Sequence, residues 1–168
     1  ITDRDQAKTF IYAFLYGAGP AKIGKVVGGD AKQGQILVNR FLTNMPALKS
    51  LRNKVQEAGE QGYIKGLDGR VFQVRSPHSA LNTLLQGAGA IVCKQWLVSM
   101  ISMIKDAGID AKLVASIHDE YQFEVKSTDV SKFGQITKDA MTKTQKELDV
   151  HCQLDSEWKQ GLTWAETH

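Results

Sequence analysis

The sequence predicts an α+β fold in which helices dominate. Most segments repeat apolar residues three and four positions apart, as one face of a helix does. Two pairs of short apolar runs, each interrupted by turn-forming residues, indicate antiparallel hairpins. The 168 residues are 42% hydrophobic and 23% charged, which is typical of a globular core and excludes collagen-like, coiled-coil and disordered chains. A chain of this length forms one domain or part of a larger one.

The N-terminal third of the chain predicts four helices. The first covers 3–16, where apolar residues recur at helical spacings before a glycine-rich break: Phe10, Ile11, Phe14 and Leu15. Pro20 begins a short helix over 20–27, since proline is tolerated in a first helical turn. The third helix covers 31–42 and the fourth, after Pro46, covers 47–58.

The middle of the chain predicts a hairpin followed by a long helix. Residues 63–65 and 71–74 are expected to pair around Asp68-Gly69, because glycine tolerates the positive φ of such a turn. The segment 79–105 has a helical pattern and is apolar on most sides. Helices of that kind are usually buried, so we expect a core helix there.

The C-terminal part predicts a second hairpin and one amphipathic helix. Residues 113–117 and 121–125 are expected to pair around His118-Asp119, and the amphipathic helix covers 129–148. The tail, 154–168, is short and mixed. We find no internal repeat and no low-complexity linker.

Charge is unevenly distributed along the chain. Residues 1–100 hold 13 Lys and Arg against 6 Asp and Glu, whereas residues 101–168 hold 8 against 12. A basic half suits polyanions such as nucleic acid, and an acidic half suits divalent cations. Charges that only solvate a surface are the commoner cause of such a pattern, so charge does not decide the function.

Cysteine usage indicates a reducing compartment, and the sequence shows no targeting or membrane signal. Cys93 and Cys152 form no CxxC pair, so we expect neither a disulfide framework nor a zinc knuckle and assign a cytoplasmic location. The longest uncharged run, 76–93, would make a poor membrane span because of its polar residues, and no membrane partner is expected. The chain begins at Ile1 without a signal peptide, which we interpret as a cut end.

Four side chains form one slanting row on the first predicted helix. Arg4, Lys8, Tyr12 and Tyr16 follow one another at intervals of four residues, with Gly17 closing the row. Cations bind phosphate oxygens and rings pack against a sugar or base, so the row suits a nucleoside triphosphate. The alternative is a surface stripe with half-buried rings, which is the commoner explanation for any single row.

The second predicted hairpin carries adjacent carboxylates at its tip. In Ser116-Ile117-His118-Asp119-Glu120, Asp119 and Glu120 could face a metal while the flanking strands anchor the turn. A polar hairpin turn without a ligand explains the same residues about as well. On the long helix, Asn82 and Gln86 share a face and could contact nucleic acid, although packing against backbone would satisfy them equally.

Two other motifs are excluded by their context. Gly19-Pro20-Ala21-Lys22-Ile23-Gly24-Lys25 fits the spacing of a phosphate-binding loop, but Val26 replaces the metal-binding Ser or Thr and no strand precedes it. The pair His118-Asp119 is similar to that of metal phosphohydrolases, whose pair lies on a helix among further histidines. His78, His151 and His168 show no such ligand spacing.

Taken in order, these motifs resemble the C-terminal part of a family A DNA polymerase, closest to its phage replicative branch. The row Arg4 to Gly17 is similar to the helix motif of the fingers. The segments 67–70, 75–78 and 82–86 resemble the chain that leads into the palm, and 118–120 resembles the second catalytic motif. Trp164-Ala165 and His168 resemble the natural C-terminus. The resemblance covers essentially the whole chain and implies fingers over 1–75 and part of an antiparallel-sheet palm over 76–168.

The resemblance implies a role for each residue of the row. Arg4 and Lys8 would bind the incoming dNTP, with Lys8 a catalytic residue that donates a proton to the leaving pyrophosphate. Tyr12 would pack on the nucleotide sugar, and family members with Tyr here accept nucleotides that lack the 3′-hydroxyl. Tyr16 would guard the templating position.

It also implies the contacts to DNA and metal. Asn82 and Gln86 would contact the minor groove of primer–template DNA, where correct base pairs share an acceptor pattern. His78 and His118 are further candidate DNA contacts. Asp119 and Glu120 would be catalytic metal ligands for Mg²⁺ in a two-metal site that is incomplete here, because the family's other metal aspartate lies upstream of Arg4.

We therefore expect a C-terminal fragment of a DNA-directed DNA polymerase that is inactive alone and acts in the cytoplasm of a bacterial host. Its expected partners are the missing upstream segment, in the same or a separate chain, or a second copy of the fragment that associates through apolar surface. The alternatives are a catalytically dead DNA- or nucleotide-binding remnant and one half of a split polymerase. An unrelated metal hydrolase is a remote further alternative.

Overall fold

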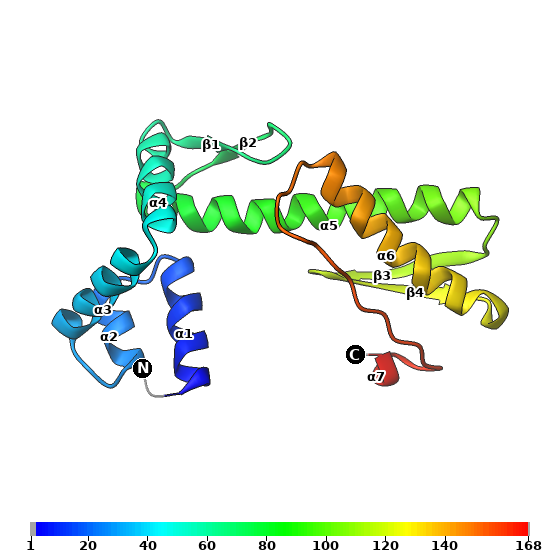
Figure 1. The fold of residues 1–168 in the computed structure, drawn as a ribbon, viewed down its shortest axis with the longest axis horizontal. Coiled ribbons are helices and arrows are strands. Elements are labelled where there is room, and N and C mark those ends of the chain that lie inside the picture. The colour runs from blue at the N-terminus through cyan, green and yellow to red at the C-terminus, as the bar shows by residue number, and fades with distance from the viewer. Residues whose placement is uncertain (1–2, 168) are drawn as a thin grey trace. The chain divides into compact units, whose positions relative to one another are not determined.

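The computed structural model describes residues 3–167 and is α+β with helices dominant. The chain divides into two compact units, one up to Gly87 and one from Ala88 on, and each is described by itself (Figure 1). His168, the last residue of the expected C-terminal motif, lies outside the described residues.

All four helices expected in the N-terminal third are present, within two residues of their expected ends. They are α1 (Arg4–Leu15), α2 (Pro20–Val26), α3 (Ala31–Asn44) and α4 (Pro46–Gly59). The Asp3 side chain caps α1 by accepting a hydrogen bond from the Gln6 amide at 2.7 Å. Asp30 and Gln33 cap α3 reciprocally as a capping box.

One apolar cluster holds the first three helices and the start of α5 (Ala80–Asp106) together. Its buried members come from α1, α2, α3 and α5: Phe10, Phe14, Ile23, Val38, Leu42 and Leu81. The Phe41 ring meets both α1 phenylalanines edge-on, with centroids 5.2 Å from each. The buried rings fix one face of α1, so its opposite face is left for the polar row.

The first hairpin pairs β1 (Tyr63–Lys65) with β2 (Val71–Gln73) in antiparallel register. Gly69 has φ +81 in the connecting turn, as the Asp68-Gly69 signal predicts. The Phe72 ring packs on the backbone of α5 at Gly87, where an added Cβ would lie 2.6 Å from the ring. Glycine at this position therefore lets β2 lie directly against α5.

A single 3-10 turn, η1 (Pro77–Ser79), precedes α5 and was not expected from the sequence. α5 itself is buried on one side only: Trp96, Met100 and Ile104 are buried, whereas Val98 and Ile101 are 62% and 45% exposed. By length and composition the stretch Pro77–Asp106 could span a membrane, a test that core helices also pass. The expectation of a buried helix is thus met along one face of α5.

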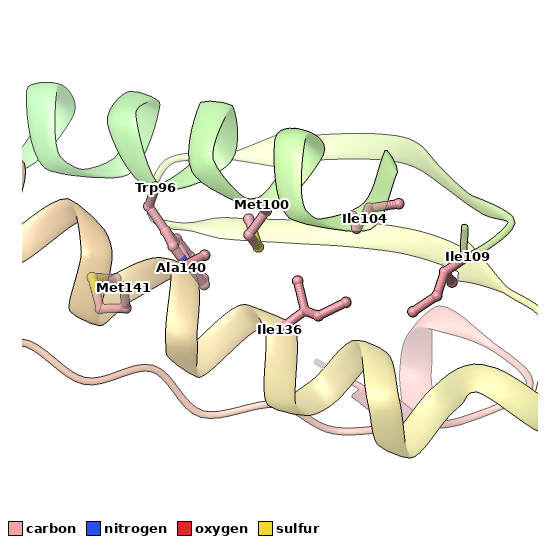
Figure 2. Packing of buried hydrophobic residues seen from close by; sticks show 7 residues of the cluster. All are labelled: Trp96, Met100, Ile104, Ile109, Ile136, Ala140 and Met141. Atoms are coloured by element: carbon pink, nitrogen blue, oxygen red, sulfur yellow. The ribbon is translucent and has the colours of Figure 1, made fainter. Parts of the chain in front are cut away.

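In the second unit, α5 and α6 (Val130–Glu147) pack together beside a two-stranded antiparallel sheet. Figure 2 shows side chains of both helices, together with Ile109 from the loop after α5, in this core: Trp96, Met100, Ile104, Ile109, Ile136, Ala140 and Met141. The Trp96 indole N–H donates to the buried carbonyl of Thr137 at 2.8 Å. Its one polar atom is therefore satisfied inside the core.

The sheet of the second unit consists of β3 (Ala111–Ile117) and β4 (Glu120–Val125), followed by η2 (Ser127–Asp129). Pairing shifts between Leu113 and Ala115, so Val114 forms a bulge. Tyr121, Phe123 and Val125 pack on the core. Because strand side chains alternate, the intervening Glu120 and Gln122 belong to the other face.

The tail returns along the second unit and ends in α7 (Trp164–Thr167). Trp158 packs on α6 at Gly134, where an added Cβ would lie 2.2 Å from the indole ring. The Leu154 amide donates to the Gln145 side chain at 2.8 Å. The tail is therefore attached at several points, although it contains little regular structure.

Candidate functional site

The row of Arg4, Lys8, Tyr12 and Tyr16 lies along the exposed face of α1. Tyr16 is the C-cap residue, one position past the helix, and Gly17 follows with φ +76. The two tyrosine rings are nearly parallel, with centroids 6.1 Å apart and an interplanar angle of 13°. They are 47% and 57% exposed, so flat ring surface is available to a ligand.

A cavity of about 490 Å³ lies beside these rings. Its lining includes both tyrosines and two residues that the sequence did not single out, Thr9 and Lys22. Lys22 belongs to α2, which packs back against α1 after the turn at Gly17. The residue spacing on α1 could not predict Lys22, because Lys22 reaches the cavity only through the direction in which the chain turns after Tyr16.

The His78 backbone lies close to the end of this row, and Asn82 follows in the first turn of α5. A Cβ on Gly17 would lie 3.3 Å from the backbone oxygen of His78, so η1 passes directly beside the turn after Tyr16. The Asn82 Oδ1 atom is buried and has no hydrogen-bond partner in the described part of the chain. Gln86, one turn further along α5, is exposed. The first unit thus contains every predicted binding residue from Arg4 to Gln86, and it places the His78 backbone beside the end of the row.

Asn82 is half-buried, and its amide has both an acceptor and a donor to offer a ligand. The minor-groove atoms common to all base pairs are acceptors, and they would bind the Asn82 amide nitrogen. The 2-amino group of guanine is the donor in that groove. The Asn82 side chain therefore carries hydrogen-bonding capacity that a duplex can satisfy.

His118, Asp119 and Glu120 form the end of the hairpin in the second unit. His118 and Asp119 connect the strands, and Glu120 opens β4, where it pairs with Ile117. His118 has φ +53, a left-handed conformation that costs a non-glycine residue about 1–2 kcal/mol. His118 and Asp119 are exposed and Glu120 is half-buried, so the tip presents one free-standing and one partly enclosed carboxylate.

Asp119 is electrostatically connected to α5. Burial, together with the Asp119 carboxylate, raises the pKa of the Cys93 thiol. Burial and the neighbouring Cys93 raise the pKa of the Tyr121 hydroxyl. Both groups are therefore neutral at ordinary pH, so neither adds a charge beside the Asp119 carboxylate.

The two carboxylates have the donor chemistry of a Mg²⁺ site but do not complete one. Mg²⁺ is commonly held by one or two carboxylates together with substrate phosphates and water. In the described residues, no group of three or more His, Cys, Asp or Glu side chains is arranged to hold a metal ion. Asp119 and Glu120 therefore fit as part of a ligand set that other groups must fill.

Comparison with known proteins decides the family. The family model for DNA polymerase family A matches residues 1–166. The chain belongs to DNA polymerase family A. It is 42% identical to the DNA-directed DNA polymerase of Enterobacteria phage T3 and 41% identical to that of Escherichia phage T7. Each match covers 98% of this chain and 27% of the phage protein, so the chain spans about a quarter of those relatives.

A solved structure gives the same fold. The polymerase domain of Pol1 from M. smegmatis, in complex with DNA primer-template and dNTP, matches with a TM-score of 0.76 and 19% identity. The match covers 83% of this chain and 27% of that chain. The expected family A polymerase fold, its phage-type relatives and its helix-dominated α+β class are thus confirmed.

Proposed function

We propose that this family A chain provides the nucleotide-binding helix and one metal-binding hairpin of a DNA-directed DNA polymerase. In this proposal residues 1–75 are fingers, residues 76–168 are the C-terminal part of the palm, and the protein acts in the cytoplasm of a bacterial host. The exposed row on α1 carries the proposal, since two cations precede two parallel rings along one helix face, and the rings line a cavity together with Lys22.

On the nucleotide side, Arg4 and Lys8 bind the triphosphate and Lys8 donates the proton that the leaving pyrophosphate needs. Tyr12 packs on the sugar, and Tyr16 with the turn at Gly17 limits the templating position. The buried Phe10 and Phe14 fix the opposite face of α1, so these four groups are held without a ligand present.

On the DNA side, Asn82 and Gln86 contact the minor groove of the primer–template near the new base pair. The Asn82 side chain supports this role through its amide nitrogen, which can donate to the acceptors that all base pairs share in that groove. His78, whose backbone lies beside Gly17, and His118 at the hairpin tip are further DNA contacts.

On the metal side, Asp119 and Glu120 hold Mg²⁺. When bound, two such ions activate the primer 3′-oxygen and stabilise the leaving oxygen. The exposed Asp119 presents its carboxylate at a rigid turn, and Glu120 is held at the start of β4. Because these two groups are fewer than a two-metal site requires, we propose that this chain alone does not polymerise and needs a further carboxylate from the rest of the polymerase.

The test measures binding and extension separately with the purified chain. Anisotropy of a labelled dNTP should show Lys8→Ala weakening affinity about tenfold, the factor for one charge-assisted contact, while Lys138→Ala on the exposed side of α6 leaves it unchanged. A labelled primer–template should bind in a salt-sensitive manner and should bind more weakly to Asn82→Ala. Absence of both kinds of binding contradicts the proposal. Primer extension that Asp119→Asn abolishes contradicts the proposed inactivity.

A polymerase that contains this chain should also report the role of Tyr12. Tyr12→Phe removes only the hydroxyl, so it should increase discrimination against dideoxynucleotides with little effect on dNTP affinity. The measurement is the ratio of kcat/KM for dNTP and dideoxynucleotide on one primer–template. An unchanged ratio would show that Tyr12 does not face the 3′ position of the sugar.

A further inference from the structure

Gln122 lies on β4, two residues after Glu120, and therefore on the same face of the strand. Its neighbours Tyr121 and Phe123 pack into the core on the other face. Gln122 is half-buried and lines, together with Glu120 and Thr167, a cavity of about 740 Å³ between β4 and the tail. The sequence motif at the hairpin ends at Glu120 and gives Gln122 no role.

The Gln122 amide joins two groups that are far apart in the sequence. Its Nε2 donates to the Glu120 carboxylate at Oε1. Its Oε1 accepts from the hydroxyl of Thr167 in α7 at 3.2 Å, a hydroxyl that also lies 3.1 Å from the Trp164 carbonyl. One amide thus uses both its donor and its acceptor to connect the hairpin with the end of the tail.

We propose that Gln122 is a positioning residue that holds the Glu120 carboxylate in place, and that α7 keeps Gln122 in the required rotamer through Thr167. This inference rests on the proposed metal role of the hairpin. A free Glu side chain samples several rotamers, and a metal must immobilise it on binding. A carboxylate that is already held by a charge-assisted hydrogen bond loses less freedom, so the metal binds it more tightly.

Two pairs of variants separate this role from a general effect on folding. Gln122→Met keeps the length and unbranched shape of the side chain but removes the amide. Gln135→Met is the matched control, because Gln135 on α6 also donates to a carboxylate, that of Asp139 at 2.9 Å, on the exposed surface. Thr167→Val removes the hydroxyl at equal size, whereas Thr167→Ser keeps it.

The first measurement uses the metal-free chain. NMR relaxation of a labelled Glu120 side chain should show lower order in Gln122→Met and Thr167→Val, and wild-type order in Thr167→Ser and Gln135→Met. If the order parameter of the Glu120 side chain is unchanged in Gln122→Met, the inference is wrong. Lower order in Gln122→Met with wild-type order in Thr167→Val overturns the part assigned to α7. Because α7 is a terminal turn, the Thr167 pair stays informative even where Gln122→Met unfolds the chain.

The second measurement is Mn²⁺ affinity, followed by the loss of the free-ion EPR signal. Gln122→Met should weaken binding about tenfold, as loss of a group that orients a metal ligand does, and Gln135→Met should not. Lower Glu120 order with unchanged Mn²⁺ affinity overturns the positioning role. If Asp119→Asn leaves Mn²⁺ binding unchanged, the proposed metal site has failed, and the NMR measurement still decides whether Gln122 holds Glu120.

Discussion

The row on α1 and the tip of the β3–β4 hairpin are held in place in opposite ways. The row stands on a helix whose other face is anchored by Phe10 and Phe14, which are 2% and 5% exposed. The hairpin tip stands on two strands with a bulge, a left-handed His118 and a bridging amide. A binding surface on a packed helix needs only the core beneath it, whereas a carboxylate at a turn needs local contacts for each side chain.

The largest expected effect comes from removing the anchor of α1. Phe10→Ala should destabilise the first unit by about 3–5 kcal/mol, since a buried aromatic ring is lost and a cavity remains. All three tryptophans, Trp96, Trp158 and Trp164, belong to the second unit, so tryptophan fluorescence follows that unit alone. Far-UV circular dichroism should therefore show an early transition that fluorescence does not. Coincident transitions would show that the two units unfold together.

A smaller effect is expected from relieving the strain at the hairpin tip. His118→Gly should stabilise the second unit by about 1 kcal/mol or less, because glycine adopts φ +53 freely but costs chain entropy. Asp149→Gly is the matched control, since Asp149 has φ +50 away from the candidate site. Chemical denaturation measures the free energy of unfolding of both variants.

If the strained turn serves metal binding, only His118→Gly should also weaken Mn²⁺ binding. Equal binding by both glycine variants would mean that the left-handed residue is a feature of the turn alone. In that case the hairpin tip would resemble the row on α1, where the fold alone positions the polar groups.

Cysteine reactivity tests the connection between the hairpin tip and α5. Because burial and Asp119 raise the pKa of Cys93, alkylation near neutral pH should modify the exposed Cys152 first and Cys93 slowly. Asp119→Asn should accelerate Cys93 modestly and leave Cys152 unchanged, as followed by mass spectrometry. If the alkylation rate of Cys93 is the same in Asp119→Asn, the Asp119 carboxylate does not affect the thiol on α5.

The smallest effect concerns the turn of the first hairpin. Arg70 holds the pKa of the exposed Asp68 carboxyl below its usual value, chiefly through a side-chain hydrogen bond within an ion pair of 2.7 Å. A lowered pKa stabilises the folded state above the unfolded-state value, and this contribution is lost as the pH falls through the folded-state pKa. Arg70→Gln should therefore flatten the acid side of the stability–pH curve slightly. High salt should mimic the substitution, because both groups are exposed.

The sequence predicted the elements well because their signals are local. Periodicity, prolines and glycines gave α1 to α6 and both hairpins but not α7 or the 3-10 turns, and the interval of four residues placed Arg4 to Tyr16 on one face. The exposed side of α5 could not be predicted, since a helix that is apolar all round has no period to show which side is buried.

The details around the candidate site depend on non-local contacts. The bulge at Val114 is a matter of pairing register, which composition does not record. Lys22 reaches its cavity through the direction of a turn, and Gln122 accepts a hydrogen bond from Thr167, forty-five positions further along the chain. Such residues carry no motif of their own, so only the folded chain identifies them.

The bulge at Val114 also has a consequence for natural length variation. Leu113 pairs with Phe123 and Ala115 with Gln122, so Val114 is one residue more than the ladder uses. Deleting it would leave both pairs, the alternation of faces and the turn at His118-Asp119 as they are. The hairpin can therefore absorb a single-codon deletion at this position without changing the face of any paired side chain, whereas deletion of Ser116 or Ile117 would turn Ala115 to the opposite face of the sheet.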